Sequence, residues 1–196
     1  MQHCSIAGIT PMPDAIIQLM IQRQVWCAVQ PTTTRYLEAQ AKTAGRFPPR
    51  VPWVGLLRTA DQNERRLIAA HAPLLLATDA GITDPDAWAV LPDEQKIDNS
   101  TALGPAHFTW FDAMAEKRMA PMDMILAATR NIAMAYHVVD DFGTLEPGKR
   151  ADLLLLDADP LANIANVRKI SMVMKDGAVV DREALPLHPM LTVPRS

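Results

Sequence analysis

The feature that most constrains the fold is residues 74–81, which read LLLATDAG. Four consecutive apolar or small residues without alternation are typical of a strand covered on both faces, as in a parallel sheet. The segment VWCAVQPT at 25–32 has the same character and ends near Pro31. Helical patterns at 13–24 and 60–72 precede these two strands. This alternation predicts an α/β fold in which parallel strands are joined by crossover helices.

The region after the apolar strand contains a loop and two predicted helices. Residues 81–104 are rich in turn formers and acids, which is typical of either a pocket-lining loop or a solvated face. Pro105 and Pro121 stand where helices near 105–118 and 121–136 would begin. We therefore expect the first domain, residues 1–136, to end with two helices.

From residue 137 the pattern changes to short strands. Segments 151–157, 170–175 and 178–181 are apolar, and the last two flank Asp176-Gly177, a strong hairpin signal. We expect residues 137–196 to form a separate small β-sandwich region with a tail.

Composition excludes several functional classes. The net charge is −3 and no basic stripe is visible, which argues against nucleic acid as a partner. No apolar run is long enough to span a bilayer, and the first residues lack the pattern of a signal peptide. Two cysteines do not make a disulfide framework, so we expect a cytoplasmic protein without a membrane partner.

Asp79, at the tip of the apolar strand, needs an explanation. A buried carboxylate without a partner is costly, so a cation, a group of donors or a metal should lie beside it. The structural alternative is a side chain that caps the following turn.

An ordered series of motifs resembles the C-terminal end of the metal-dependent amidohydrolase superfamily, in its imidazolonepropionase- and prolidase-like branch. LLLATDAG resembles the eighth barrel strand and AATRNIAMAY the helix after it. GTLEPGKRADLLLLDADPL resembles the passage into a small β-sandwich, and VMKDGAVV its closing hairpin. Upstream, QHCSI resembles the sixth strand and QPTTT the end of the seventh. The resemblance implies the last three strands of a (β/α)₈ TIM-type barrel plus a sandwich piece.

The resemblance also implies a site. Asp79 would bind a divalent metal, zinc first among the candidates, and accept a proton from the attacking water, while His3 would be a metal ligand. The reaction would be hydrolysis of a C–N bond in a small amide, cyclic amide or dipeptide-like substrate. Arg35 and His107 are candidates for substrate binding, by pairing with a carboxylate in the case of Arg35. The plainer alternative for His3, Arg35 and His107 is a solvated surface side chain.

One departure from the family is large. A whole barrel takes about 250 residues, and the 196-residue chain lacks the His-x-His pair of the first strand. We therefore expect a C-terminal portion that needs a missing N-terminal half or self-association. A rival hypothesis is a non-catalytic remnant or a subunit. A receiver-like domain with Asp79 as phosphoacceptor leaves the DG hairpin unexplained.

Overall fold

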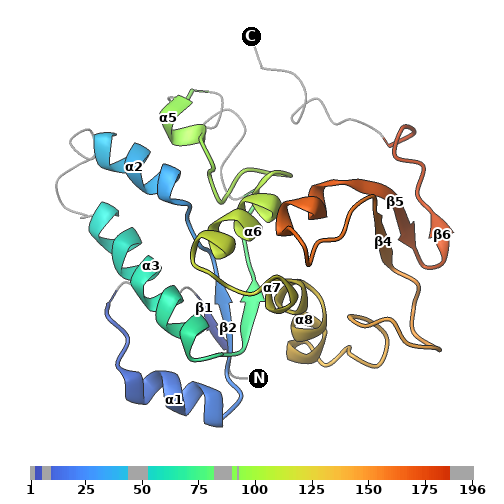
Figure 1. Ribbon diagram of the computed structural model, residues 1–196, viewed down its shortest axis with the longest axis horizontal. Helices are drawn as coiled ribbons and strands as arrows, with labels where there is room; N and C mark the ends of the chain where they lie inside the picture. Colours follow the sequence, from blue (N-terminus) through green and yellow to red (C-terminus); the bar gives the residue numbers. More distant parts are fainter. Residues whose placement is uncertain (1–2, 6–9, 44–52, 82–89, 92, 186–196) are drawn as a thin grey trace.

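Strands and helices alternate along the first half of the computed structural model, which describes residues 3–5, 10–43, 53–81, 90–91 and 93–185 (Figure 1). The elements of this half, in chain order, are β1 (His3–Ser5), α1 (Asp14–Gln22), β2 (Trp26–Val29), α2 (Thr34–Thr43), α3 (Trp53–Ala69) and β3 (Leu74–Leu76). The predicted helix at 60–72 thus begins earlier, at Trp53, and α2 was not predicted.

The three strands form one parallel sheet in the order β1-β2-β3. His3 pairs with Trp26 and Cys27 pairs with Leu74, which sets the register of both ladders. This confirms the prediction that the segments near 2–6, 25–31 and 74–79 are parallel and adjacent. Because the strands are parallel, the turns that follow β2 and β3 lie at the same edge of the sheet.

An apolar core lies between this sheet and the helices. Burial alternates along β2: Cys27 and Val29 are fully buried, whereas Trp26 and Ala28 are only partly so. The side chains of Cys27 and Val29 pack into one cluster with residues of α1, α3, α6 (Ala106–Glu116) and α7 (Pro121–Ala128). The helices therefore gather on the face of β2 to which Cys27 and Val29 point.

The predicted helix at 121–136 is two helices, α7 and α8 (Arg130–Ala135), separated by Thr129. Thr129 has φ −132° and ψ −91°, and its hydroxyl donates to the carbonyl of Ile125 at 2.7 Å. Such a bond to residue i−4 competes with the helical ladder. After the break, the Asn131 amide donates to the carbonyl of Leu74 at 3.1 Å, so α8 is tied to β3.

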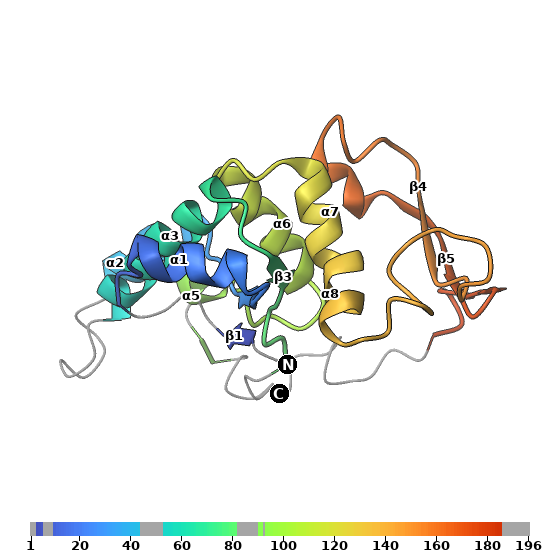
Figure 2. The same ribbon diagram turned by 90° about the horizontal axis from the view of Figure 1, so that it is seen from below.

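Another small sheet follows residue 137. It contains β4 (Leu153–Leu156), β5 (Ile170–Lys175) and β6 (Ala178–Val179), with the 3₁₀ helix η1 (Ile164–Arg168) between β4 and β5. Both pairings are antiparallel, which confirms the predicted small sheet. Asp176 and Gly177 both have positive φ, as a type I′ hairpin turn requires. Both views show this sheet beyond α6–α8, away from α1–α3 (Figure 2).

In the described part of the chain, none of the helices combines the length and the apolar character required to cross a bilayer. Part of the predicted loop at 81–104 forms a short helix, α5 (Asp93–Lys96), and residues 82–89 and 92 lie outside the described residues. The same holds for the tail at 186–196.

Candidate active site at the carboxyl edge of the parallel sheet

The turns after β2 and β3 are joined by a side-chain amide. Gln30 follows the last residue of β2, and its Nε2 donates to the carbonyl of Thr78 at 2.8 Å and to the hydroxyl of Ser100 at 3.2 Å. The main chains also stay paired beyond the strands, since the amide of Ala77 donates to the carbonyl of Val29 at 3.2 Å. The segments that follow β2 and β3 at the carboxyl edge are therefore held together by hydrogen bonds.

Asp79 projects from this edge with an exposed side chain. Its φ is +50°, in the left-handed region that aspartate tolerates better than most residues. The turn is capped by the hydroxyl of Thr78, which accepts from the amide of Ala80 at 3.2 Å. Among the described residues, none donates a hydrogen bond to the Asp79 carboxylate or forms an ion pair with it. The cap that the structural alternative assigned to Asp79 is supplied by Thr78, and the carboxylate expected to be buried beside a partner is exposed.

The backbone of His3 lies at the other end of the sheet. His3 pairs with Trp26, the first residue of β2, whereas Asp79 comes after the last residue of β3. At this register the two predicted metal ligands are not brought together. Their roles as ligands stay predictions.

The two predicted substrate-binding residues lie on helices. Arg35 stands in the first turn of α2 with its guanidinium 3.9 Å from the Asp98 carboxylate, and its side chain is 67% exposed. His107 lies exposed in the first turn of α6. No contact between either residue and Asp79 occurs among the described interactions.

A metal would need more ligands than this edge offers. Within the ranges that the structure describes, no group of three or more His, Cys, Asp or Glu residues is placed to hold a metal ion. Asp79 is a suitable donor for a divalent cation, but a catalytic zinc takes three protein ligands. The described residues therefore do not fit a metal by themselves.

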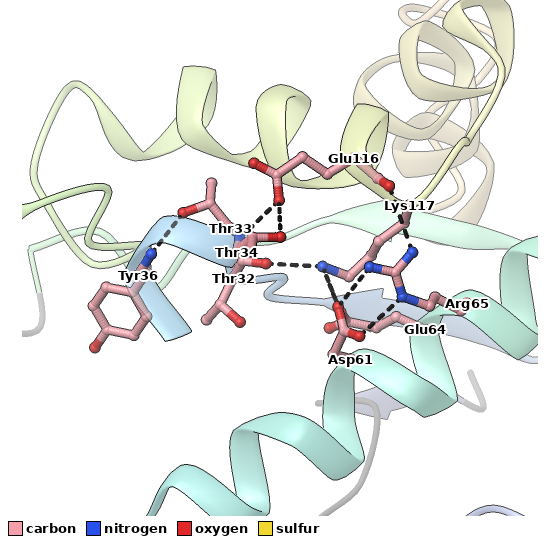
Figure 3. A network of polar contacts seen from close by, with 9 residues as sticks. All are labelled: Thr32, Thr33, Thr34, Tyr36, Asp61, Glu64, Arg65, Glu116 and Lys117. Carbon is pink, nitrogen blue, oxygen red and sulfur yellow. Dashed lines mark hydrogen bonds and ion pairs between the residues drawn. The ribbon is translucent and has the colours of Figure 1, made fainter. Parts of the chain in front are cut away.

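A buried ionic cluster, absent from the sequence-based prediction, lies behind the turn after β2 (Figure 3). Lys117, at the end of α6, is 1% exposed, and its Nζ donates to the carbonyl of Thr32 at 2.8 Å. The same Nζ is 3.0 Å from Asp61 Oδ1 and 3.5 Å from Glu64 Oε2, both on α3. The sequence indicates this cluster only in part. Glu64 occupies a core position of the α3 pattern, seven residues after Leu57 and three before Leu67, which is unusual for a glutamate.

The pKa values of the two acids of this cluster are shifted in opposite directions. Burial raises the pKa of Glu64 to about 7, although Lys117 opposes the rise, and Glu64 Oε2 has no hydrogen-bond partner among the described residues. The ion-pair distance from Lys117 thus lacks hydrogen-bond geometry. Partial burial also acts to raise the pKa of Asp61, but hydrogen bonds from Arg65 and Lys117 outweigh it and lower that pKa. At neutral pH the lysine is therefore paired firmly with Asp61 and loosely with Glu64.

Helix α6 holds the turn after β2 at three backbone positions. Trp110 Nε1 donates to the carbonyl of Val29 at 3.0 Å, and Lys117 binds the carbonyl of Thr32. The Glu116 carboxylate accepts from the amide of Thr34 at 2.7 Å, where the positive end of α2 favours an anion. These contacts from α6 and Lys117 thereby fix the backbone position of Gln30, which lies inside this turn.

Comparison with known proteins identifies the family. Residues 12–180 match the amidohydrolase family. The imidazolonepropionase of Shouchella clausii (strain KSM-K16) is 29% identical over 127 residues, covering 63% of this chain and 25% of that protein. The imidazolonepropionase of Geobacillus thermodenitrificans (strain NG80-2) is 32% identical over 130 residues, covering 65% and 27%. The chain thus spans about a quarter of the length of these curated relatives.

Solved structures agree with this match. A molinate hydrolase superposes with a TM-score of 0.86 at 38% identity, covering 96% of this chain and 40% of that one. Phenylurea hydrolase B gives a TM-score of 0.81 at 36% identity, covering 93% and 39%. A Xaa-Pro dipeptidase, at 20% identity and a TM-score of 0.65, shares the fold. Because the family match extends over most of its residues, this chain belongs to the amidohydrolase family.

Proposed function

We propose that this chain is part of a hydrolase that cleaves a C–N bond next to a carbonyl group, with Asp79 as general base. The observation that carries the proposal is the exposed Asp79 carboxylate at the carboxyl edge of a parallel sheet, which has no partner among the residues that the structure describes. Enzymes built on (β/α)₈ barrels place their catalytic groups at this edge. The family match and the two hydrolase structures above 35% identity support the reaction class.

The chemistry assigned to Asp79 is proton transfer. The carboxylate would accept a proton from a water molecule as the water oxygen bonds to the carbonyl carbon. The C–N bond then breaks, and the same proton passes to the departing nitrogen. An exposed carboxylate to which no described residue donates a hydrogen bond is suited to this exchange.

The substrate would be a small molecule with an N-acyl bond. An amide, a cyclic amide and a dipeptide-like compound all have such a bond, and so does a urea. The likeness to phenylurea hydrolase B favours a urea as the first substrate to test. Arg35 and His107 are proposed to contact the substrate, because both are exposed on helices that begin near this edge.

Metal dependence is part of the same proposal. Asp79 is proposed as a ligand of a divalent ion, zinc first. His3, which the resemblance implies as a second ligand, pairs at the other end of the sheet, so in this register it would not share that ion with Asp79. Further ligands would come from outside the described residues, supplied by additional polypeptide or by a second copy of this chain. The chain spans about 40% of the molinate hydrolase chain, which leaves room for such a contribution.

The domain arrangement is proposed to follow the family. Residues 1–136 would be part of a (β/α)₈ barrel and residues 137–196 a small sandwich region. Helices gathered on one face of β2 support the barrel, since a doubly wound sheet has helices on both faces. The antiparallel sheet β4-β5-β6 supports the second region.

Hydrolysis of a phenylurea and of a dipeptide, followed through the released amine, tests the proposal. The chain is assayed with zinc, alone and with a polypeptide that supplies the remaining barrel strands. In the active form, Asp79→Asn is expected to lower turnover by about 10²–10⁴-fold, the usual contribution of a general base. Its melting temperature should not change, because the side chain is exposed. Asp123→Asn, at an exposed aspartate in α7, is the matched control. Full turnover by Asp79→Asn would reject Asp79 as the base.

A further inference from the structure

The Gln30 amide links three separate segments of the carboxyl edge. The side chain starts directly after β2, and its two donor bonds reach Thr78 after β3 and Ser100 before α6. The acceptor at Thr78 is the carbonyl of the peptide bond that leads into Asp79. One side chain thus fixes the plane of the peptide from which Asp79 projects.

The backbone of Asp79 needs such support. A non-glycine residue in the left-handed region is held there by its surroundings, because the conformation is less favourable than an extended or right-handed one. The Asp79 side chain makes no described hydrogen bond that could hold it. The hydroxyl of Thr78 fixes the amide of Ala80, which is the next peptide bond along the chain. Gln30 and Thr78 therefore hold the peptides on both sides of Asp79.

Gln30 is itself anchored on both sides. One residue earlier, the carbonyl of Val29 accepts from Trp110, which is 1% exposed. Two residues later, the carbonyl of Thr32 accepts from the buried Lys117. Both anchors come from α6 or the residue that ends it, so the backbone from which Gln30 extends is held against a rigid element.

We propose that Gln30 is a positioning residue for Asp79: its amide holds the Thr78–Asp79 peptide in the orientation that presents the carboxylate at the edge of the sheet. This inference rests on the proposed function of Asp79. It adds a residue that need not touch substrate and acts through the main chain.

The first test is structural and needs no activity. In Gln30→Met the side chain keeps its length and loses both donors. The three-bond HN–Hα coupling of Asp79, which reports φ, is expected to shift in NMR spectra, together with the Asp79 amide nitrogen. Gln30→Glu, measured at pH 8, also lacks donors but stays polar, so it should show the same shift. Gln62→Met, at an exposed glutamine of α3, is the control and should leave both signals unchanged.

The second test is kinetic. In the active form, Gln30→Met is expected to lower kcat by about 10- to 100-fold, the range for a misplaced catalytic group. KM should change less than twofold, and Gln62→Met should behave as wild type. If the coupling of Asp79 is the same in wild type, Gln30→Met and Gln30→Glu, the proposal is wrong. A wild-type protein without hydrolysis would reject the proposed function, while the NMR result would still decide whether Gln30 holds Asp79.

Discussion

Replacing Glu64 with glutamine is expected to remove the decrease in the free energy of unfolding that the Glu64 carboxyl causes as the pH rises. Glu64 is 2% exposed, and its Oε2 lies 3.5 Å from the Lys117 ammonium without forming a hydrogen bond. Burial therefore raises the pKa of this carboxyl, more than the nearby ammonium lowers it. Glutamine has the same size and no charge, so it resembles the protonated acid that the buried site prefers.

The magnitude follows from the pKa of Glu64, which rises from 4.5 to about 7 on folding. A rise of about 2.5 units, at 1.36 kcal/mol per unit, corresponds to roughly 3 kcal/mol. The folded state binds this proton more tightly than the unfolded state. Glu64 therefore leaves stability intact below about pH 4.5 and lowers it as the pH rises through 7. Between pH 5 and pH 8 the free energy of unfolding should fall by roughly 2–3 kcal/mol from this group.

Urea denaturation followed by circular dichroism at pH 5, 6, 7 and 8 measures this effect. The difference in stability between Glu64→Gln and wild type should grow in favour of the variant as the pH rises. Glu38→Gln, at an exposed glutamate of α2, is the control and should keep the wild-type profile. Parallel profiles for Glu64→Gln and wild type would show that Glu64 is ionised in the folded state throughout this range, and would refute the reasoning.

Two further substitutions test the packing behind the turn after β2 and at the break between α7 and α8. Lys117→Met should destabilise the protein by about 1–3 kcal/mol in urea denaturation, because the buried Thr32 carbonyl loses its donor, whereas Asp61 keeps its ion pair with Arg65. Lys42→Met, at an exposed lysine, should be nearly neutral, and equal effects of the two substitutions would contradict the argument. Gly143→Ala should cost about 2–4 kcal/mol, because φ is +91° and the new Cβ would lie 2.6 Å from Ala133 Cβ. Gly148→Ala shares the positive φ, and its new Cβ would have no contact within 4 Å among the described residues, so a smaller loss of stability in its melting curve isolates the effect of the Gly143 contact.

Local patterns were sufficient for β2 and β3, whereas β1 was expected only from the family resemblance of QHCSI. LLLATDAG and VWCAVQPT lack polar alternation, and the structure pairs them in parallel. Asp176-Gly177 supplied the turn between β5 and β6 because both positions need positive φ. The break at Thr129 could not be predicted in this way, since neither glycine nor proline marks it. It coincides with a bond from the Thr129 hydroxyl to Ile125 and with the close approach of Gly143, which depends on the tertiary fold.

The candidate site was likewise predictable only where a local pattern determines it. The position of Asp79 after a buried strand can be read from the sequence, and its exposure at the carboxyl edge is consistent with the predicted role. The hydrogen bonds that fix this edge cannot be predicted from the sequence, because they join residues far apart in the chain. Gln30 and Thr78 are 48 positions apart, and Lys117 and Thr32 are 85 apart. No periodicity within a helix or strand carries information over such separations.

The bond from Asn131 to Leu74 restricts which strand could lengthen the parallel sheet. Residues 73 and 77 bond toward β2, so the carbonyl of Leu74 points to the outer edge of β3. An exposed strand edge is a template for pairing with another chain. Here one acceptor of that template is already occupied by an amide from a helix that packs on the same strand. A strand added at this edge must either displace Asn131 or begin its ladder beyond Leu74, at the level of Leu76. Helix α8 thereby restricts the register of a strand that pairs at this edge.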